Sequence, residues 1–237
     1  MKSDFLNKAV FYNVYPTSFY DSNGDGVGDI NGITEKLDYI KQFANIVWIN
    51  PVFKSPFKDG GYDVEDYCAI DERFGSIKDV ESLTTKAHKL GMKIIFDLVV
   101  GHTSETHKWF LESRKENRNE YSDYYIWTNN VFEEGVSGIS GNAPRNGTYA
   151  VNFFCFQPSL NYGYYKKDRA WQFDYKDERL SILHNEVVKI MKFWLKKGVD
   201  GFRCDMAESI VKNDDKGRGS CEIWRKLFGE VRKSYPD

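Results

Sequence analysis

The sequence predicts an α/β fold built on a parallel sheet and interrupted by one long insertion. Short, β-rich apolar runs alternate with longer segments whose apolar residues recur at helical spacing. One strand-like run is apolar almost throughout, as expected of a parallel strand covered on both faces. From residue 103 to about residue 171 the alternation stops. We therefore expect strand–helix units with right-handed crossovers around a single insertion.

The first two strand–helix units precede the insertion. Strands are expected at residues 10–15 and 46–50, each closed by a proline. A capping-box pattern at Ser76 opens the second helix, and Gly91 ends it. The first helix is indicated by four apolar residues at helical spacing, Ile33, Leu37, Ile40 and Ala44.

Two more strands flank the insertion. The third is expected at residues 93–100, which are apolar except for Asp97, and the fourth begins at Gly201, after a helix that ends at a glycine. The insertion is too long for an ordinary connection and is expected to form a subdomain with functional loops. The helix before the fourth strand has an apolar face formed by Leu183, Val187, Ile190, Met191 and Trp194. The last helix has an apolar face formed by Ile223, Leu227 and Val231. The chain thereby divides at 1–102, 103–171 and 172–237.

Composition excludes several classes of protein. With 237 residues, 41% of them hydrophobic, the chain is globular and long enough for one sizeable core or two modest domains. It has 33 basic and 35 acidic residues, so no basic field indicates nucleic acid and no polybasic run indicates a membrane surface. The expected partner is a neutral small molecule.

The cysteines and the first residues indicate where the protein works. Residues 1–5 lack the apolar core of a signal peptide, and no run approaches transmembrane length. The four cysteines form no CxxC pair and have no metal-ligand spacing, which predicts reduced thiols. We therefore expect a cytoplasmic protein. The cysteines are Cys68, Cys155, Cys204 and Cys221.

Polar residues at the predicted strand ends indicate a site. Arg203 and Asp205 are two positions apart, so strand geometry directs both side chains to one face. A carboxylate beside a guanidinium stays ionised near neutrality and can act as a nucleophile, although a structural ion pair has the same spacing. Asp97 is either a site residue or a strand-end acid that bonds the next loop. These residues and His102 lie where (β/α) barrels place their chemistry.

The loop at residues 21–29 is a separate candidate site. Oxygen-bearing side chains occur at every second position with glycines between them, a pattern that wraps a hard cation. A hydrated turn rich in Asp, Asn and Gly is the alternative. An EF-hand is not expected, because Gly32 stands where that motif requires a glutamate.

Three ordered stretches resemble the α-amylase family of retaining glycoside hydrolases, especially its oligo-1,6-glucosidase and α-glucosidase members. The stretches are Asp97-Leu98-Val99-Val100-Gly101-His102-Thr103-Ser104, Gln157-Pro158-Ser159-Leu160-Asn161 and Gly201-Phe202-Arg203-Cys204-Asp205. The resemblance implies a (β/α)8 barrel of which this chain supplies the first four βα units, with domain B inserted after the third strand. It also implies an oligosaccharide or disaccharide substrate. The aromatic residues of the insertion either stack on sugar rings or pack a small core of their own.

The resemblance assigns roles to individual residues. Asp205 would be the nucleophile that forms a glycosyl ester, and Arg203 would keep it ionised and oriented. His102 and Asp63 would bond hydroxyls of the sugar, Tyr62 would stack on its ring, and Asp97 would support the hydrogen-bond network. In the oligo-1,6-glucosidase branch the loop is a structural calcium site, with ligands Asp21, Asn23, Asp25, Val27 and Asp29.

Three departures from the family pattern limit what it implies. Gly101 replaces an asparagine that binds a different calcium ion, and Ser159 replaces an aspartate of its motif. Met206 follows the nucleophile where linkage-selective members often carry valine, alanine or threonine. Linkage specificity therefore cannot be read. A transglycosylase, a sucrose-cleaving or isomerising relative and a catalytically silent binding protein remain alternatives.

The barrel is expected to need more chain than is present. A (β/α)8 barrel takes about 250 residues before insertions, and here four strand–helix units are counted. The resemblance places the glutamate acid/base after a fifth strand and a third aspartate after a seventh. Both are expected from a remaining half of the barrel, and without it the chain is expected to be inactive.

Overall fold

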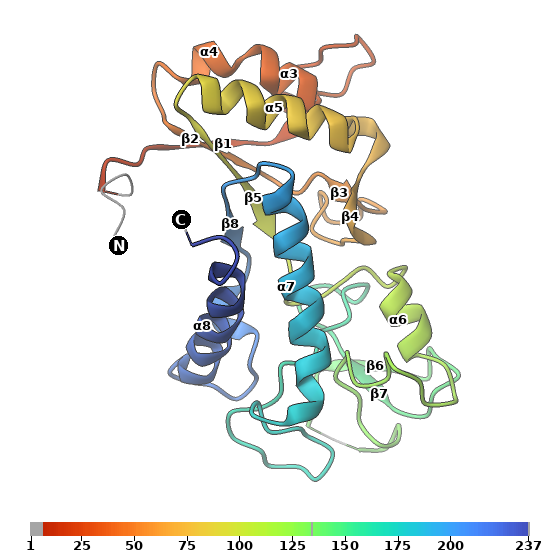
Figure 1. The fold of residues 1–237 in the computed structure, drawn as a ribbon. Coiled ribbons are helices and arrows are strands. Elements are labelled where there is room, and N and C mark those ends of the chain that lie inside the picture. The colour runs from red at the N-terminus through yellow and green to blue at the C-terminus, as the bar shows by residue number, and fades with distance from the viewer. Residues whose placement is uncertain (1–6, 134, 237) are drawn as a thin grey trace.

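A computed structural model describes residues 7–133 and 135–236. Residues 1–5, from which we inferred that the chain has no signal peptide, lie outside the described residues. Four parallel strands form the central sheet in the order β1-β2-β5-β8 (Figure 1). Their bounds are Phe11–Val14 for β1, Ile46–Ile49 for β2, Lys93–Leu98 for β5 and Gly201–Cys204 for β8. The predicted parallel sheet of four strands is confirmed.

Helices connect these strands as the apolar spacing predicts. Helix α5, Ile77–Lys89, opens with the predicted capping box between Ser76 and Asp79. Helix α7, Ser181–Lys196, ends before Gly198, whose φ of 91° is costly for other residues. The first predicted helix is divided at Lys36 into α3, Ile30–Glu35, and α4, Leu37–Ile40. The remaining helices are α2 (Pro16–Phe19), α6 (Lys108–Ser113) and α8 (Arg218–Arg232).

Several short elements lie outside the predicted pattern. Strands β3, Phe53–Lys54, and β4, Asp66–Ile70, pair antiparallel between β2 and α5. Strands β6, Gly138–Ser140, and β7, Thr148–Ala150, form an antiparallel pair between β5 and α7. Strands this short carry too little alternation to be recognised. The part of the chain that the structure describes also has three short 3-10 helices, at Glu72–Phe74, Glu178–Leu180 and Ala207–Ser209.

The core joins the sheet to its helices through aromatic contacts. Trp194 of α7 stacks on Phe53 at 5.3 Å between ring centroids and meets Phe96 of β5 edge-on at 5.4 Å. Its indole nitrogen donates to the carbonyl of Tyr67 at 2.7 Å, which ties α7 to β4. Such buried aromatic pairs contribute about 0.5–1.5 kcal/mol beyond their burial. These contacts hold α7 against β3, β4 and β5.

The segment between β5 and α7 carries its own aromatic packing. Phe110 meets Tyr125 at 5.1 Å and Tyr149 at 4.9 Å, and Tyr149 meets Trp127 at 5.1 Å. All four rings are buried. These aromatic residues therefore pack a small core of the insertion, which was one of the two roles expected for them. An isolated bridge between His102 and Ser159, with a backbone bond from Leu160 to the carbonyl of Gly101 at 3.1 Å, joins the start of the segment to its second signature stretch. The division of the chain at residues 102 and 171 stays a prediction.

Two open edges bound the sheet. Among residues 7–133 and 135–236, strand β1 pairs only with β2 and β8 only with β5, whereas the two inner strands are paired on both sides. Phe11 of β1 is 52% exposed, while β2 and β5 are mostly buried. Within the described ranges, no helix is both long and apolar enough to cross a membrane.

Candidate active site

The register of the sheet brings Asp97 and Arg203 together. Asp97 of β5 is paired in register with Arg203 of β8, so the two side chains lie side by side at the same level of the sheet. Asp205 follows directly after β8, and its backbone N–H donates to the carbonyl of Leu98 at 3.0 Å. The three residues therefore meet at the carboxyl ends of adjacent parallel strands, as their positions in the sequence predict.

One nitrogen of Arg203 bonds both carboxylates. Nη1 lies 2.8 Å from Oδ1 of Asp97 and 2.6 Å from Oδ1 of Asp205. Burial alone would lower the pKa of Arg203, but the bonds and negative charges of Asp97 and Asp205 outweigh it and raise that pKa. The guanidinium is therefore a permanent cation that orients both acids.

Burial separates the two acids. The Asp97 side chain is 0% exposed, and the Asp205 side chain is 14% exposed. Burial raises the pKa of Asp97, although Arg203 and two further donors oppose that rise. The second oxygen of Asp97 accepts from Nε1 of Trp48 at 2.9 Å and from the hydroxyl of Tyr62 at 3.1 Å. Asp97 thus accepts three side-chain hydrogen bonds and is fully buried, which leaves Asp205 as the reachable carboxylate.

Tyr62 belongs to a chain of polar groups along the strand ends. Its hydroxyl accepts from the amide of Asn50 at 2.8 Å, and Asn50 accepts from the amide of Asn13 at 2.7 Å. Burial, followed by the charge of Asp97, raises the pKa of Tyr62, so the hydroxyl stays protonated. Trp48, Asn50 and Asn13 were not predicted. Asn50 was recognisable as a polar residue at the end of an apolar strand.

His102 is held between two neighbours. Its Nε2 lies 3.0 Å from the carbonyl oxygen of Tyr62, and its Nδ1 lies 3.0 Å from the side-chain amide of Asn152. Burial lowers the pKa of His102 to about 4. The ring is therefore neutral, with Nε2–H donating to Tyr62 and Nδ1 accepting from Asn152. Both ring nitrogens have partners within the protein in this arrangement. The expected bond from His102 to a sugar hydroxyl stays a prediction.

Lys212 fixes the orientation of Asn152. Its ammonium group donates to Oδ1 of Asn152 at 3.2 Å and to the carbonyl of Ser209 at 3.0 Å. Burial lowers the pKa of Lys212 to about 8. The amide nitrogen of Asn152 also lies 3.3 Å from the sulfur of Met206, the residue after Asp205. Lys212 and Asn152 thus link the inserted segment to the end of β8.

The structure places Asp63 away from the expected role. Asp63 is fully buried, and its oxygens accept from the hydroxyl of Ser55 at 3.0 Å and the backbone N–H groups of Lys58 at 3.0 Å and Asp59 at 3.1 Å. It stabilises its own loop instead of facing a substrate. The reason is that Gly60 and Gly61 turn the chain between Asp59 and Asp63, both with positive φ.

Asp59 is the acid of this loop that sequence analysis missed. Its Oδ2 accepts from Nε2 of Gln157 at 2.7 Å, which links the loop to the second signature stretch. Burial raises the pKa of Asp59, and the charges of Asp63 and Asp205 add to the rise. Asp59 therefore lies within the electrostatic field of Asp205. Its position just before two glycines was the available signal.

The loop at residues 21–29 is organised by its own acids. The Asp21 carboxylate accepts backbone N–H groups from Asn23, Gly24 and Gly26, and the bond from Gly26 is the largest cause that lowers its pKa. Asp29 is buried and caps α3 through a 2.6 Å bond from the N–H of Gly32. Over the described residues, no group of three or more His, Cys, Asp or Glu side chains converges on one point.

The donor chemistry of this loop nevertheless fits calcium. Asp21, Asn23 and Asp25 provide carboxylate and amide oxygens, and Val27 provides a carbonyl, all of which calcium prefers. Asn23 and Asp25 are exposed, so their remaining lone pairs face solvent. Asp29 differs, because both of its oxygens already bond Ser22.

A parallel βα sheet with an Asp–Arg–Asp cluster at its carboxyl edge defines part of a barrel enzyme. Residues 13–223 match the family described as "Alpha amylase, catalytic domain". The chain belongs to this α-amylase family, and the resemblance drawn from the three sequence stretches is confirmed. The family domain is a (β/α)8 barrel, and the described sheet is consistent with its first βα units.

The relatives are carbohydrate-active enzymes. The oligo-1,6-glucosidase of Parageobacillus thermoglucosidasius is 44% identical over 242 residues, which cover 98% of this chain and 40% of that protein. The trehalose-6-phosphate hydrolase of Bacillus licheniformis has a TM-score of 0.79 at 34% identity, over 96% of this chain and 42% of that one. The trehalulose synthase of Pseudomonas mesoacidophila has a TM-score of 0.82 at 30% identity, over 99% and 44%. The chain thus spans about two fifths of the length of these relatives.

Proposed function

We propose that this chain carries the nucleophile side of a retaining glycosidase that cleaves α-glucosidic bonds of short oligosaccharides. The observation that carries the proposal is the bond of 2.6 Å between Arg203 and Asp205 at the carboxyl end of β8. Asp205 is the partly exposed acid of the cluster, and Asp97 behind it is fully buried. A reachable carboxylate beside a fixed cation suits covalent catalysis.

In the proposed reaction, Asp205 attacks the anomeric carbon and forms a glycosyl ester. The glycosidic bond breaks, and its oxygen takes a proton from a second carboxyl group about 5 Å away. Water deprotonated by that group then attacks the ester, which releases the sugar and restores both acids. Arg203 keeps Asp205 ionised and oriented, and Asp97 holds Arg203 in place through its own bond of 2.8 Å.

The substrate class rests on the relatives and on charge. A relative aligned over 98% of the chain is named an oligo-1,6-glucosidase, and the chain itself is nearly neutral, with a net charge of −2. An isomerising or transglycosylating enzyme is the second candidate, favoured by the likeness to a trehalulose synthase. The two differ in the acceptor that attacks the ester, which is water in one case and a sugar hydroxyl in the other.

We also propose that a further segment with four more βα units completes the barrel and supplies the second carboxyl group. Support comes from the two unpaired edges at β1 and β8, and from relatives that match this chain over about two fifths of their length. Open parallel edges favour association unless they are covered. A segment whose strands pair with the open edges of β1 and β8 would bury Phe11 and close the sheet into a barrel.

Calcium binding at the loop of residues 21–29 is a further proposal. Asp21, Asn23, Asp25 and the Val27 carbonyl would hold the ion, and Asp29 would link the site to α3 as its cap. The ion would supply structural stability there and no chemistry.

A cytoplasmic location is likewise proposed from the state of the thiols. All four cysteines are free in the structure, as suits a reducing compartment. Fractionation of cells that express a tagged full-length protein tests this, and recovery of the tag from the medium would contradict it.

The experiment for the main proposal uses the full-length protein. Isomaltose, maltose, sucrose and a nitrophenyl α-glucoside are supplied in turn, and the anomer of the first product is followed by NMR. We expect α-glucose to be released first. A fluorinated glucosyl substrate that slows ester breakdown should add one glucosyl mass to the peptide that contains Asp205. A β product, or label on any other peptide, would overturn the assignment.

A further inference from the structure

We propose that Lys212 is a positioning residue for Asp205, the nucleophile of the proposed glycosidase, because it fixes the neighbours of that acid. Lys212 lies outside the three stretches that resemble the family. Its ammonium group donates to Asn152 and to the turn that follows Asp205, and it reaches the reacting carboxylate only through these neighbours. The inference rests on the proposed function and adds a residue that sets the geometry of the site.

The charge of Lys212 decides how the Asn152 amide is oriented. An ammonium group only donates, so the oxygen of the amide must face Lys212, at 3.2 Å. The amide nitrogen then faces Nδ1 of His102 at 3.0 Å and the sulfur of Met206 at 3.3 Å. If the amide were reversed, its NH2 group would meet the donors of the ammonium group. The amide is therefore fully hydrogen-bonded in one orientation only.

The orientation of that amide in turn sets the proton of His102. Because Nδ1 accepts, the ring proton is on Nε2, which donates to the carbonyl of Tyr62 at 3.0 Å. The hydroxyl of Tyr62 donates to Asp97 at 3.1 Å. Arg203 then joins Asp97 to Asp205. A continuous path of hydrogen bonds, passing through one tyrosine, thus runs from the ammonium group to the nucleophile.

A second contact holds the turn that begins after Asp205. Lys212 also donates to the carbonyl of Ser209 at 3.0 Å. Both the N–H and the hydroxyl of Ser209 donate to the carbonyl of Met206, each at 3.1 Å. Met206 has φ 46° and ψ 39°, a left-handed conformation that is unfavourable for a residue with a side chain. Lys212 therefore helps to hold a strained turn whose first residue adjoins the nucleophile.

The surroundings of the Lys212 ammonium group do not favour its charge. The residue is partly exposed, but protein surrounds its ammonium group, and this burial lowers its pKa to about 8. No carboxylate of the described residues raises that pKa. The group is still largely protonated at neutral pH. A buried ammonium without a paired carboxylate is unfavourable for folding, and such groups are typical of functional sites.

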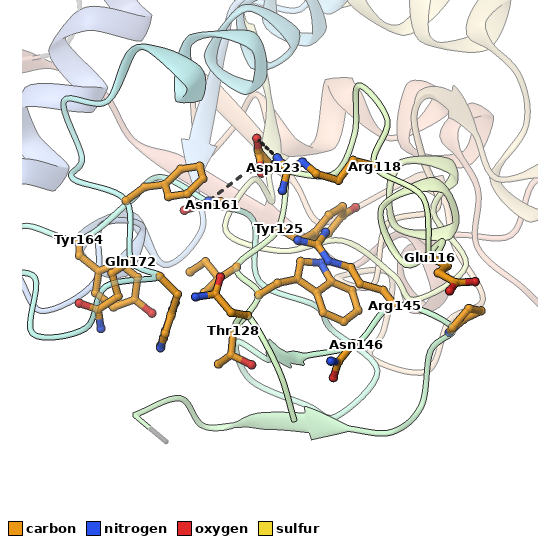
Figure 2. Close-up of a pocket in the computed structure, with 16 residues that line it drawn as sticks. Glu116, Arg118, Asp123, Tyr125, Thr128, Arg145, Asn146, Asn161, Tyr164 and Gln172 are labelled. Atoms are coloured by element: carbon orange, nitrogen blue, oxygen red, sulfur yellow. Dashed lines mark hydrogen bonds and ion pairs between the residues drawn. The ribbon is translucent and has the colours of Figure 1, made fainter. Parts of the chain in front are cut away.

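The backbone of Lys212 is fixed by the end of the inserted segment. Its N–H donates to the carbonyl of Gly163, and its carbonyl accepts from the N–H of Tyr165, both at 2.9 Å. Tyr164 lies between these two residues, and its ring packs edge-on against Trp171 at 5.7 Å. Figure 2 shows Tyr164 among the side chains that line a hollow of the inserted segment. The ammonium group therefore extends from an anchored backbone.

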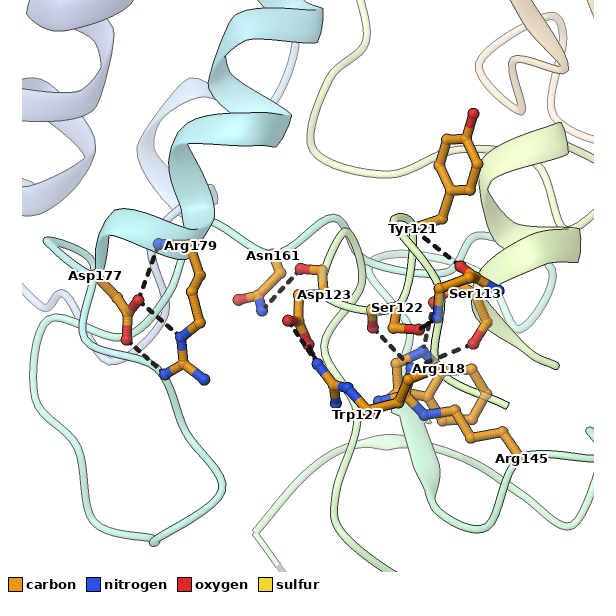
Figure 3. Close-up of polar contacts among 11 residues, drawn as sticks. Ser113, Arg118, Tyr121, Ser122, Asp123, Trp127, Arg145, Asn161, Asp177 and Arg179 are labelled. Carbon is orange, nitrogen blue, oxygen red and sulfur yellow. Dashed lines mark hydrogen bonds and ion pairs between the residues drawn. The ribbon is translucent and has the colours of Figure 1, made fainter. Parts of the chain in front are cut away.

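The inserted segment that carries Asn152 is itself supported. Nη1 of Arg145 donates to the carbonyl of Ser122 at 2.7 Å and to that of Ser113 at 3.2 Å (Figure 3). The backbone N–H of Asn152 donates to the carbonyl of Gln157 at 3.0 Å. A residue that positions a site needs such a support, since its own geometry must be fixed first.

Three variants of the full-length protein test this role. Lys212→Met keeps the length of the side chain and removes its charge, so kcat should fall about ten- to hundred-fold while KM stays within about two-fold. Lys212→Arg keeps the charge and should recover most of the loss. Lys86→Met is the matched control and should leave kcat unaltered. Lys86 likewise donates to a backbone carbonyl, that of Thr34 at 2.9 Å, but it lies on α5 away from the site.

The tautomer of His102 is a second readout that does not depend on hydrolysis. In protein with nitrogen-15 labelled histidine, NMR should find the ring proton of His102 on Nε2 in the parent. Lys212→Met should give a mixture of tautomers, because the Asn152 amide is then free to reverse. Loss of the signals in His102→Gln assigns them. Lys212→Gln takes the place of Lys212→Met if that variant does not fold.

The outcomes separate this inference from the proposed function. A full-length parent that hydrolyses no α-glucoside would refute the proposed function, and the tautomer in Lys212→Met would still decide whether Lys212 holds Asn152. With an active parent, an unaltered kcat in Lys212→Met would overturn the positioning role. A lower kcat with the parent tautomer would overturn the path through Asn152. Equal losses in Lys212→Met and Lys212→Arg, at unaltered melting temperatures, would overturn the role of the charge.

Discussion

The side-chain amide of Asn152 donates to Nδ1 of His102 at 3.0 Å, and this bond defines the neutral form of the imidazole. An amide nitrogen can only donate, so Nδ1 must accept and carries no proton. Burial is the largest cause that lowers the pKa of His102, to about 4, and the nearby charge of Lys212 adds to it. Two more buried histidines share this behaviour, His107 with a pKa lowered to about 3 and His184 with one lowered to about 4.

We therefore predict that acid destabilises the protein well above the range where carboxylates titrate. A histidine whose folded pKa lies below its ordinary value of 6.5 binds fewer protons folded than unfolded. The free energy of unfolding is thus at its full value above about pH 6.5 and falls as the pH drops toward 4. Urea unfolding at pH 7 and pH 5 should differ by a few kcal/mol. Equal stability at both values would contradict the burial of these imidazoles.

His184→Phe is predicted to stabilise the protein. Both ring nitrogens of His184 are buried without a partner among the described residues, and the ring stacks on Tyr162 at 5.7 Å. Phenylalanine keeps the stacking and removes two unsatisfied polar atoms, so the gain at pH 7 should be about 1–2 kcal/mol. The melting temperature measures it.

His107→Phe is the matched control for this change. His107 is equally buried, but its Nδ1 caps α6 by accepting the N–H of Trp109 at 3.0 Å. Loss of that cap should lower stability by about 1 kcal/mol. If both replacements shifted the melting temperature in the same direction, the contrast between a partnered and an unpartnered histidine would be wrong.

Asp205→Asn should remove turnover of the full-length protein by several orders of magnitude, because no other nucleophile can form the ester. The free energy of unfolding should stay within about 1 kcal/mol of the parent value, since residue 205 remains hydrogen-bonded through its backbone to Leu98. Asp215→Asn, at an exposed position near by in the sequence, is the control and should leave turnover unaltered. Comparable activity in both variants would sink the assignment.

Calcium binding is tested by melting temperature with chelator and with added calcium. An ion that binds only the folded state stabilises it by mass action, so chelator should lower the temperature and calcium restore it. Asp25→Ala, at an exposed ligand position, should abolish the response. Asp29→Ala should lower stability even in chelator, because Asp29 caps α3. A melting temperature that changes with neither addition would contradict calcium binding and favour a hydrated turn without a metal ion.

Residues 1–237 alone should associate and should not hydrolyse an activated α-glucoside. Strands β1 and β8 have unpaired edges, and Phe11 is exposed on β1. Light scattering after size exclusion measures the mass, and Phe11→Lys should reduce association by placing a charge on the edge. A well-behaved monomer with ordinary turnover would refute this prediction.

Local chemistry was enough to predict the sheet and its helices. Ser76 and Asp79 form the expected capping box, and a glycine with positive φ follows α7 as expected. The β3–β4 pair was missed because its register depends on a contact between Phe53 and Ile70, which are distant in the sequence. The division at Lys36 was missed because the helical spacing continues through it.

The sequence by itself determined which residues lie at strand ends, since strand geometry directs Arg203 and Asp205 to one face wherever the strand is placed. Only the tertiary structure decided their partners. The register of β5 against β8 set Asp97 beside Arg203, and the path of the loop through Gly60 and Gly61 buried Asp63. The physical reason is the distance along the sequence over which each interaction acts. Backbone preference and side-chain period act over a few residues, whereas a hydrogen-bond partner depends on which distant segments become neighbours.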